Sequence, residues 1–148
     1  MKNFLLPYYF KIIGLSLILI GILFSVFYLK YDFKYTTAVF ALVSMYMENR
    51  FFVITQTNTI DEIILILFVV GFGLLVFSKE KSEAEFFTVA REKALVKASI
   101  ANTIFILISI IFIYGAGFVA ILVLNLITVF IFYLLFFYFS LNKIDKKT

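Results

Sequence analysis

The sequence contains no cysteine, no histidine and no tryptophan. Without cysteine the chain can form no disulfide. The two absences together exclude zinc sites of the Cys/His type and Cys- or His-ligated haem and iron–sulfur clusters. Histidine is also the side chain that ordinarily titrates near neutral pH, so the usual proton-transfer group is missing. We therefore expect no metal site and no cofactor, and the residue inventory leans against an enzyme.

Charged residues are scarce too, at 15% of the 148 residues, whereas hydrophobic residues make up 64%. Soluble domains are about 25% charged and about 45–50% apolar. A soluble fold of this length could not cover so much apolar surface with so few polar groups, so the lipid bilayer is the expected surrounding. The modest net charge of +4 is interpreted as a topology signal rather than as affinity for nucleic acid.

The sequence contains three long runs without a charged residue. A membrane helix needs about 20 mostly apolar residues. Residues 12–29 qualify, residues 63–78 qualify if their helix begins near Ile60, and residues 98–142 can cross twice with a turn at Tyr114-Gly115-Ala116-Gly117. The predicted fold is an all-α membrane protein, one integral membrane domain over residues 1–148. The expected transmembrane helices are at about 11–30, 60–79, 97–114 and 118–141.

Residues 31–59 separate the first two predicted spans. Their apolar part, residues 35–47, is too short to cross a bilayer, so we expect a short extracytoplasmic segment lying on the bilayer surface. A β-hairpin and an amphipathic helix both fit. Residues such as Val39, Phe40, Val53 and Ile54 favour the hairpin, because β-branched and aromatic side chains are enriched in strands.

Lysine and arginine are distributed unevenly over the two sides that four spans define. The side that contains both chain ends and the 79–97 loop carries ten of these residues. The other side carries three, namely Lys30, Lys34 and Arg50. Basic residues accumulate on the cytoplasmic side. We therefore predict a multi-pass protein of the cytoplasmic (inner) membrane with both termini and residues 79–97 in the cytoplasm.

The charge of the 79–97 loop is concentrated, since nine of its nineteen residues are charged. Ser82 and Glu85 fit a capping box, and helix-forming residues continue to residue 114 without glycine or proline. We expect one continuous helix over 83–114 that projects into the cytoplasm. The second span is expected to continue to Lys81, which makes residues 79–97 a cytoplasmic helical hairpin.

The projecting helix carries an apolar stripe at helical spacing, formed by Phe87, Ala90, Ala94 and Ala98. This stripe fits against the base of another helix or against a partner protein. A solvated hairpin with snorkelling lysines is the simpler alternative. The candidate partner-docking residues are Glu83, Glu85, Phe87 and Arg91.

Polar residues elsewhere suggest structural roles first. Thr59, Asp61 and Glu62 fit a second capping box at the start of the second span, and the adjacent carboxylates could alternatively bind a cation or a lipid head group. Asn102 and Asn125 are the most polar side chains inside the spans, and each is expected to bond to another helix. Because Asn102 lies near the inner end of its span and Asn125 toward the outer part of the next, we expect them not to meet.

Small residues along the first two spans, such as Gly14 and Gly71, indicate close helix packing within the bundle or between protomers. No aspartate, glutamate, lysine or arginine falls inside the runs 12–29, 63–78 and 98–142 that form the interior of the predicted spans, although ion-coupled transporters normally carry such residues in the membrane.

Several of these residues together resemble a group of small, uncharacterised bacterial four-helix integral membrane proteins. The resemblance rests on Thr59, Asp61 and Glu62, on the run from Ser78 to Lys81 with Glu83 and Glu85, and on Arg91. Asn102, the Tyr114-Gly115 turn and Asn125 also correspond. The chain departs at Arg91-Glu92-Lys93-Ala94-Leu95, where the group tends to have R-L-E-S-L. The resemblance implies the architecture and no activity.

Three functions follow as hypotheses. The first is a non-catalytic accessory, scaffold or sensor component that acts through its cytoplasmic hairpin, with a cytoplasmic protein or a second copy as partner. The second is a small oligomeric channel or transporter lined by glycine, serine and asparagine. The third is a lipid-modifying enzyme, for which Asp61, Glu62 and the charged hairpin are the only candidate groups.

Overall fold

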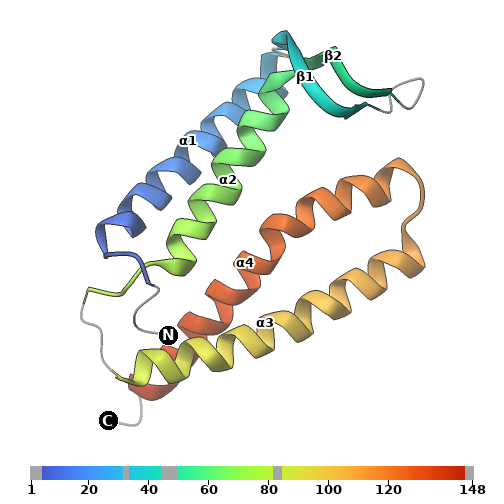
Figure 1. Ribbon diagram of the computed structural model, residues 1–148. Helices are drawn as coiled ribbons and strands as arrows, with labels where there is room; N and C mark the ends of the chain where they lie inside the picture. Colours follow the sequence, from blue (N-terminus) through green and yellow to red (C-terminus); the bar gives the residue numbers. More distant parts are fainter. Residues whose placement is uncertain (1–4, 32–33, 45–49, 82–84, 146–148) are drawn as a thin grey trace. The chain divides into compact units, whose positions relative to one another are not determined.

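The computed structural model describes residues 5–31, 34–44, 50–81 and 85–145. Apart from short connecting segments, these residues form helices and one two-stranded antiparallel sheet (Figure 1). They make two compact units, of which the first comprises Met1–Ile18 with Phe68–Thr148 and the second Leu19–Leu67. In chain order the elements are α1 (Tyr9–Tyr31), β1 (Thr36–Ser44), β2 (Arg50–Asn58), α2 (Thr59–Phe77), α3 (Glu85–Phe112) and α4 (Ala116–Asp145).

Within the described ranges, four helices are long and apolar enough to cross a membrane: Tyr9–Tyr31, Thr59–Phe77, Phe86–Phe112 and Gly117–Leu141. Most of their large apolar side chains are exposed, as expected where lipid replaces a protein core. These helices indicate a multi-pass membrane protein and confirm that the four predicted helices are present. The first begins earlier than predicted, at Tyr9, so Lys11 lies in its first turns.

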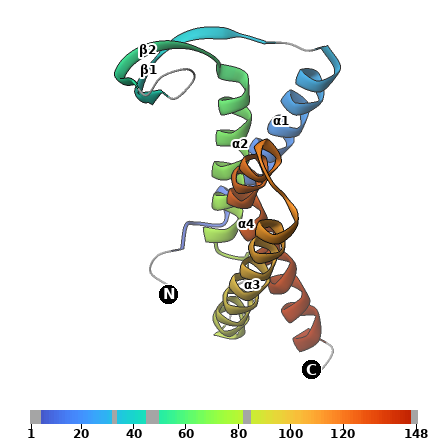
Figure 2. The same cartoon turned by 90° about the vertical axis from the view of Figure 1, so that its right-hand side faces the viewer.

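α3 and α4 lie side by side as an antiparallel helical hairpin (Figures 1 and 2). The chain reverses after Phe112, and Gly115 has a φ of +67°, a conformation that costs glycine little because it has no Cβ. The backbone N–H of Phe118 then donates to the Gly115 carbonyl at 3.1 Å, which starts the new helix. The predicted turn at Tyr114-Gly115 is confirmed.

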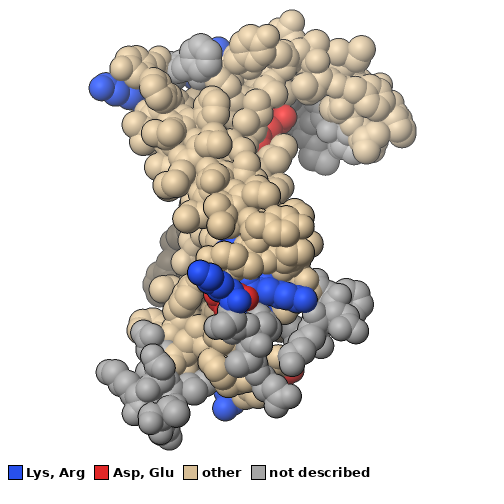
Figure 3. Space-filling model, turned by 90° about the vertical axis from the view of Figure 1, so that its left-hand side faces the viewer, with Lys and Arg blue, Asp and Glu red and all other residues tan. Residues whose placement is uncertain are grey.

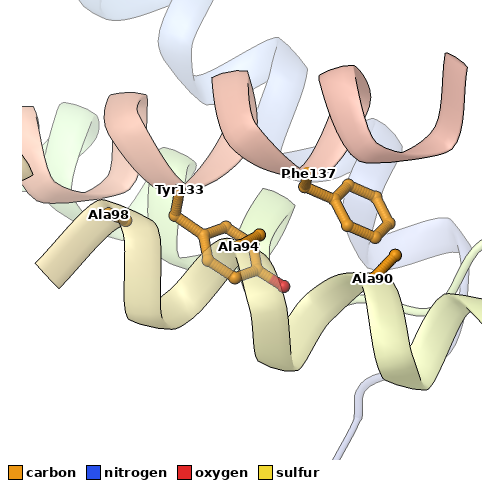
Figure 4. Packing of buried hydrophobic residues seen from close by; sticks show 5 residues of the cluster. All are labelled: Ala90, Ala94, Ala98, Tyr133 and Phe137. Atoms are coloured by element: carbon orange, nitrogen blue, oxygen red, sulfur yellow. The ribbon is translucent and has the colours of Figure 1, made fainter. Parts of the chain in front are cut away.

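The interface of this hairpin is built from alanines on α3 and aromatic rings on α4. Ala90, Ala94 and Ala98 are buried together with Tyr133 and Phe137, and the two rings extend from α4 toward the alanine side of α3 (Figure 4). Small residues let the two backbones approach, and the large rings fill the remaining space. The predicted apolar stripe therefore packs on another helix of the same chain.

α1 and α2 approach each other closely at two glycines. A Cβ added to Gly14 would lie 2.7 Å from the Gly71 carbonyl oxygen, and one added to Gly71 would lie 2.8 Å from a side-chain carbon of Ile18. Neither position has room for a larger residue. The glycine-mediated packing predicted from the sequence is thus present within one chain.

The predicted β-hairpin is confirmed, and β1 and β2 form a curved ribbon (Figure 2). Thr36 pairs with Asn58, Phe40 with Ile54, and Ala41 with Val53. Phe52 departs from strand geometry with a φ of 53°. For a bulky residue without special support, this left-handed conformation costs about 1–3 kcal/mol.

The base of the ribbon is tied to the helix ends through Asn58. Its side-chain oxygen accepts from the backbone N–H of Tyr35 at 3.1 Å, and its amide nitrogen donates to Asp61 at 3.1 Å and to the Tyr28 hydroxyl at 3.4 Å. One side chain therefore joins the ribbon to both α1 and α2.

One predicted boundary is wrong. α2 does not continue to Lys81 but ends at Phe77, and residues 78–81 are not helical. The Phe77 carbonyl accepts a bond from the backbone N–H of Leu6 at 2.8 Å, and the N–H of Lys79 donates to the Leu6 carbonyl at 2.9 Å. This short parallel bridge, Leu6 with Ser78, uses the backbone groups that a longer helix would need. The capping residue Ser82 lies outside the described residues, whereas the continuous helix is confirmed from Glu85 onward.

Candidate functional site

Polar contacts gather where the segment before α1, the end of α2 and the start of α3 come together in the first unit. We call Leu6, Lys11, Ser78, Glu80 and Arg91 the basal junction. The Leu6–Ser78 bridge described above holds its backbone. Neither Leu6 nor Ser78 stood out in the sequence as a site residue, because the contact joins residues more than seventy positions apart.

Lys11 and Glu80 form the ion pair of the basal junction. The Lys11 Nζ lies 2.5 Å from a carboxylate oxygen of Glu80, and both side chains are mostly buried. The same ammonium lies 5.4 Å from the centre of the Tyr138 ring on α4, within the range of a cation–π contact. Figure 3 shows basic and acidic atoms side by side in one patch.

Arg91 lies in the interior of the basal junction, with an exposed fraction of 3%. Its Nη2 donates to the carbonyl oxygen of Ser78 at 3.2 Å, and its guanidinium lies 5.6 Å from the centre of the Phe137 ring. Ser78 is buried as well, and its hydroxyl donates to the Leu74 carbonyl. Arg91 therefore joins the start of α3 to the end of α2 and to α4.

The other proposed docking residues have different surroundings. Phe87 is half-buried and its ring lies 6.3 Å from that of Phe137, so it faces α4. Glu83 lies outside the described residues, and Glu85 is the first residue of α3. The side chains that α3 leaves exposed near this end include Phe86, Val89, Glu92, Lys93 and Lys97.

A small apolar cavity of about 130 Å³ adjoins the buried arginine. The cavity is partly open to the outside, and an apolar group such as a short stretch of hydrocarbon chain fits its lining. It is lined by Leu5, Val76, Phe77, Arg91, Leu95, Ala98, Val129, Phe130 and Tyr133.

The two membrane asparagines contact each other, which corrects the expectation that they would not meet. The Asn125 amide nitrogen donates to the Asn102 side-chain oxygen at 2.9 Å. Asn102 lies ten residues before the last residue of α3, and Asn125 lies nine residues after the first residue of α4. Residues equally far from the turn of an antiparallel hairpin lie opposite each other. The expectation failed because it placed each amide by its depth in a predicted span instead of by its distance from the turn.

At the start of α2, the predicted capping residues belong to the network around the ribbon base. Asp61 and Glu62 lie in the first turn of α2, where carboxylates favour the positive end of the helix dipole. The Thr59 hydroxyl bonds to the Thr37 hydroxyl, and Asp61 accepts from Asn58. Cation or head-group binding at this pair stays a prediction.

Comparison with known proteins does not assign the chain to a family. No family model, no curated protein and no solved structure matches the chain. The resemblance to small bacterial four-helix membrane proteins therefore stays a prediction.

Proposed function

We propose that the chain is a non-catalytic multi-pass protein of the cytoplasmic membrane that serves as an accessory, scaffold or sensor component. In this proposal the basal junction, both termini and the start of α3 face the cytoplasm. The distribution of ten basic residues against three supports that orientation. The bilayer is its surrounding, and a cytoplasmic protein or a second copy is its partner.

The observation that carries the proposal is the two-sided character of α3 at this end. Its 28 residues extend about 42 Å, whereas the hydrocarbon is about 30 Å thick, so the first turns project beyond the membrane. One side is held on α4 by Ala90, Ala94 and Phe87. The opposite side exposes Val89 and Glu92, a mixture of apolar and charged groups that suits a protein contact.

Crosslinking from this outer side tests the proposal, and the absence of native cysteine makes a single introduced cysteine specific. Val89→Cys carrying a photoreactive maleimide is compared with Ile110→Cys, which is exposed on the same helix near its other end. We expect a discrete heavier product from Val89→Cys alone, reduced by Glu92→Lys. Twice the mass of the chain would identify a second copy as the partner. Identical results at both positions would contradict the proposal.

The alternative of a small oligomeric channel or transporter has less support. A pore would need polar and small side chains facing an aqueous path, yet Asn102 and Asn125 bond to each other and Gly14 lies against Gly71. A flux assay with the purified protein in liposomes separates the two functions, since the accessory proposal predicts no ion or solute leak. A lipid-modifying enzyme based on Asp61 and Glu62 has the least support.

A further inference from the structure

The ribbon of β1 and β2 presents one strongly apolar face. Its register places Phe40 opposite Ile54, and side chains two residues apart in a strand share a face. The exposed fractions are 64% for Phe40, 62% for Leu42, 72% for Phe52 and 71% for Ile54. The rings of Phe40 and Phe52 lie 6.4 Å apart. We call these four residues the ribbon face.

The opposite side of the ribbon differs in chemistry. Its pairs include Thr37 with Thr57 and Val39 with Thr55, and these side chains are less exposed than those of the ribbon face. This side also carries Ala41 paired with Val53, and the exposed Phe51 further along β2. Its threonines therefore lie toward the end of the ribbon that joins the helices, whereas the ribbon face carries large apolar groups along its length. An isolated two-stranded sheet is only marginally stable in water, so the ribbon face needs a cover.

The backbone of Phe52 supports a role for the ribbon face. Its φ of 53° is unfavourable for a phenylalanine, and its ring is nevertheless open to the surroundings. Strain of this kind persists where something offsets it. An apolar medium around the ring supplies such compensation, whereas water does not.

The attachment of the ribbon limits what can cover it. β2 ends at Asn58 and α2 begins at Thr59 without an intervening residue. Asn58 bonds to Tyr28 on α1 and to Asp61 on α2, and the N–H of Thr59 donates to the Tyr35 carbonyl at 3.1 Å. The ribbon therefore begins where two membrane-spanning helices end, at the bilayer surface. The exposed apolar surface of α1 leads up to it.

The size of the ribbon face favours lipid over a second copy of the chain. A large side chain buries about 150–250 Å² when it is fully covered. About two thirds of each side chain of the ribbon face is exposed, so the four side chains together offer at most roughly 650 Å² for burial. A stable protein interface needs about 800 Å² on each partner. Insertion into lipid requires no such minimum and no matching shape, because its strength rises with the apolar area buried.

We propose that the ribbon face inserts into the boundary between head groups and acyl chains at this end of α1 and α2. Phe40, Leu42, Phe52 and Ile54 then anchor the ribbon on the bilayer, with the opposite side, which carries Thr37, Thr55 and Thr57, toward water. The inference rests on α1 and α2 crossing the membrane, and the experiment below includes a position that tests this separately.

The experiment uses single tryptophans, because the chain has none. Phe40→Trp is on the ribbon face, Val39→Trp is its neighbour on the opposite side, and Leu23→Trp is an exposed position within α1. Each full-length protein is reconstituted into phosphatidylcholine–phosphatidylglycerol vesicles. Fluorescence is quenched either by phospholipids brominated on the acyl chains or by iodide in the water.

We expect brominated lipid to quench Phe40→Trp about threefold more than Val39→Trp, with the opposite order for iodide. Phe52→Gly, which suits the positive φ, should keep the ribbon but reduce lipid quenching of Phe40→Trp. Stronger iodide quenching at Phe40 than at Val39 overturns the proposal. Protection from both quenchers that disappears on dilution with lipid also overturns it, in favour of a second copy. If Leu23→Trp escapes lipid quenching, the membrane placement itself fails; if only Phe40→Trp escapes, the ribbon proposal alone fails.

Discussion

The side-chain amide of Asn125 donates a hydrogen bond of 2.9 Å to the side-chain oxygen of Asn102. The ten residues between Asn102 and the end of α3 place this bond about 15 Å from the turn. In the proposed topology the turn lies at the membrane surface, which puts the bond near the middle of hydrocarbon that is about 30 Å thick. Water is scarce at that depth, so each amide depends on the other. The pair joins α3 to α4 in addition to the buried alanine–aromatic interface.

Removing one partner should destabilise this hairpin. Asn102→Ala and Asn125→Ala should each lower the free energy of unfolding by about 0.6–2 kcal/mol, the range for hydrogen bonds between membrane helices. The double variant should cost little more than either single one, because both remove the same bond. Reversible unfolding in mixed micelles gives the three values. The control is Thr103→Ala. The exposed hydroxyl of Thr103 donates to the backbone carbonyl of Ser99 in the same helix. Strict additivity of the two asparagine variants would contradict the pairing.

Two glycines on α2 should respond oppositely to the same change. Gly71→Ala places a Cβ 2.8 Å from Ile18 and 3.0 Å from the Gly14 carbonyl, whereas a Cβ at Gly73 meets nothing within 4 Å. Overpacking of this kind costs about 1–3 kcal/mol, while alanine in an open helical position is neutral or stabilising. Thermal unfolding in detergent should therefore show a lower midpoint for Gly71→Ala alone. Equal midpoints for both variants would show that α1 and α2 do not touch at this point.

Arg91 and Lys93 are two residues apart on α3, and only the arginine is buried. Arg91→Gln removes the bond to the Ser78 carbonyl and the contact with Phe137. It should lower the free energy of unfolding by about 1.5–3 kcal/mol, as expected for a bond to a charged group. Lys93→Gln should stay within about 0.5 kcal/mol of the native chain, like other exposed substitutions. Denaturant titration of both variants checks this, and an equal loss would place the two side chains in the same surroundings.

Local features of the fold could be predicted from the sequence. The uncharged runs predict the helices, and Gly115 predicts the turn between α3 and α4. The hairpin is favoured by the strand preferences of Val39, Phe40, Val53 and Ile54. Each depends on residues close together in the chain, where composition and periodicity carry the information. The alanine stripe of α3 was predicted as a packing surface for the same reason.

Contacts between distant segments could not be predicted in this way. The bridge of Leu6 with Ser78 and the pair of Lys11 with Glu80 depend on how α1 and α2 end beside each other. No local pattern marks these residues. Arg91 is predicted from the sequence as a partner-docking residue, whereas in the structure it bonds to the Ser78 carbonyl and lies against the Phe137 ring. The Asn102–Asn125 pair was within reach of the sequence, since counting from the turn places the two amides opposite each other.

The measurement that tests the four-span topology most directly is the side from which single cysteines react. A membrane-impermeant maleimide is applied to intact and to permeabilised cells that carry Lys34→Cys, Lys93→Cys or Tyr114→Cys, all exposed positions in a chain without native cysteine. We predict that positions 34 and 114 react in intact cells and that position 93 reacts only after permeabilisation. Reaction of positions 34 and 93 from the same side would contradict the topology.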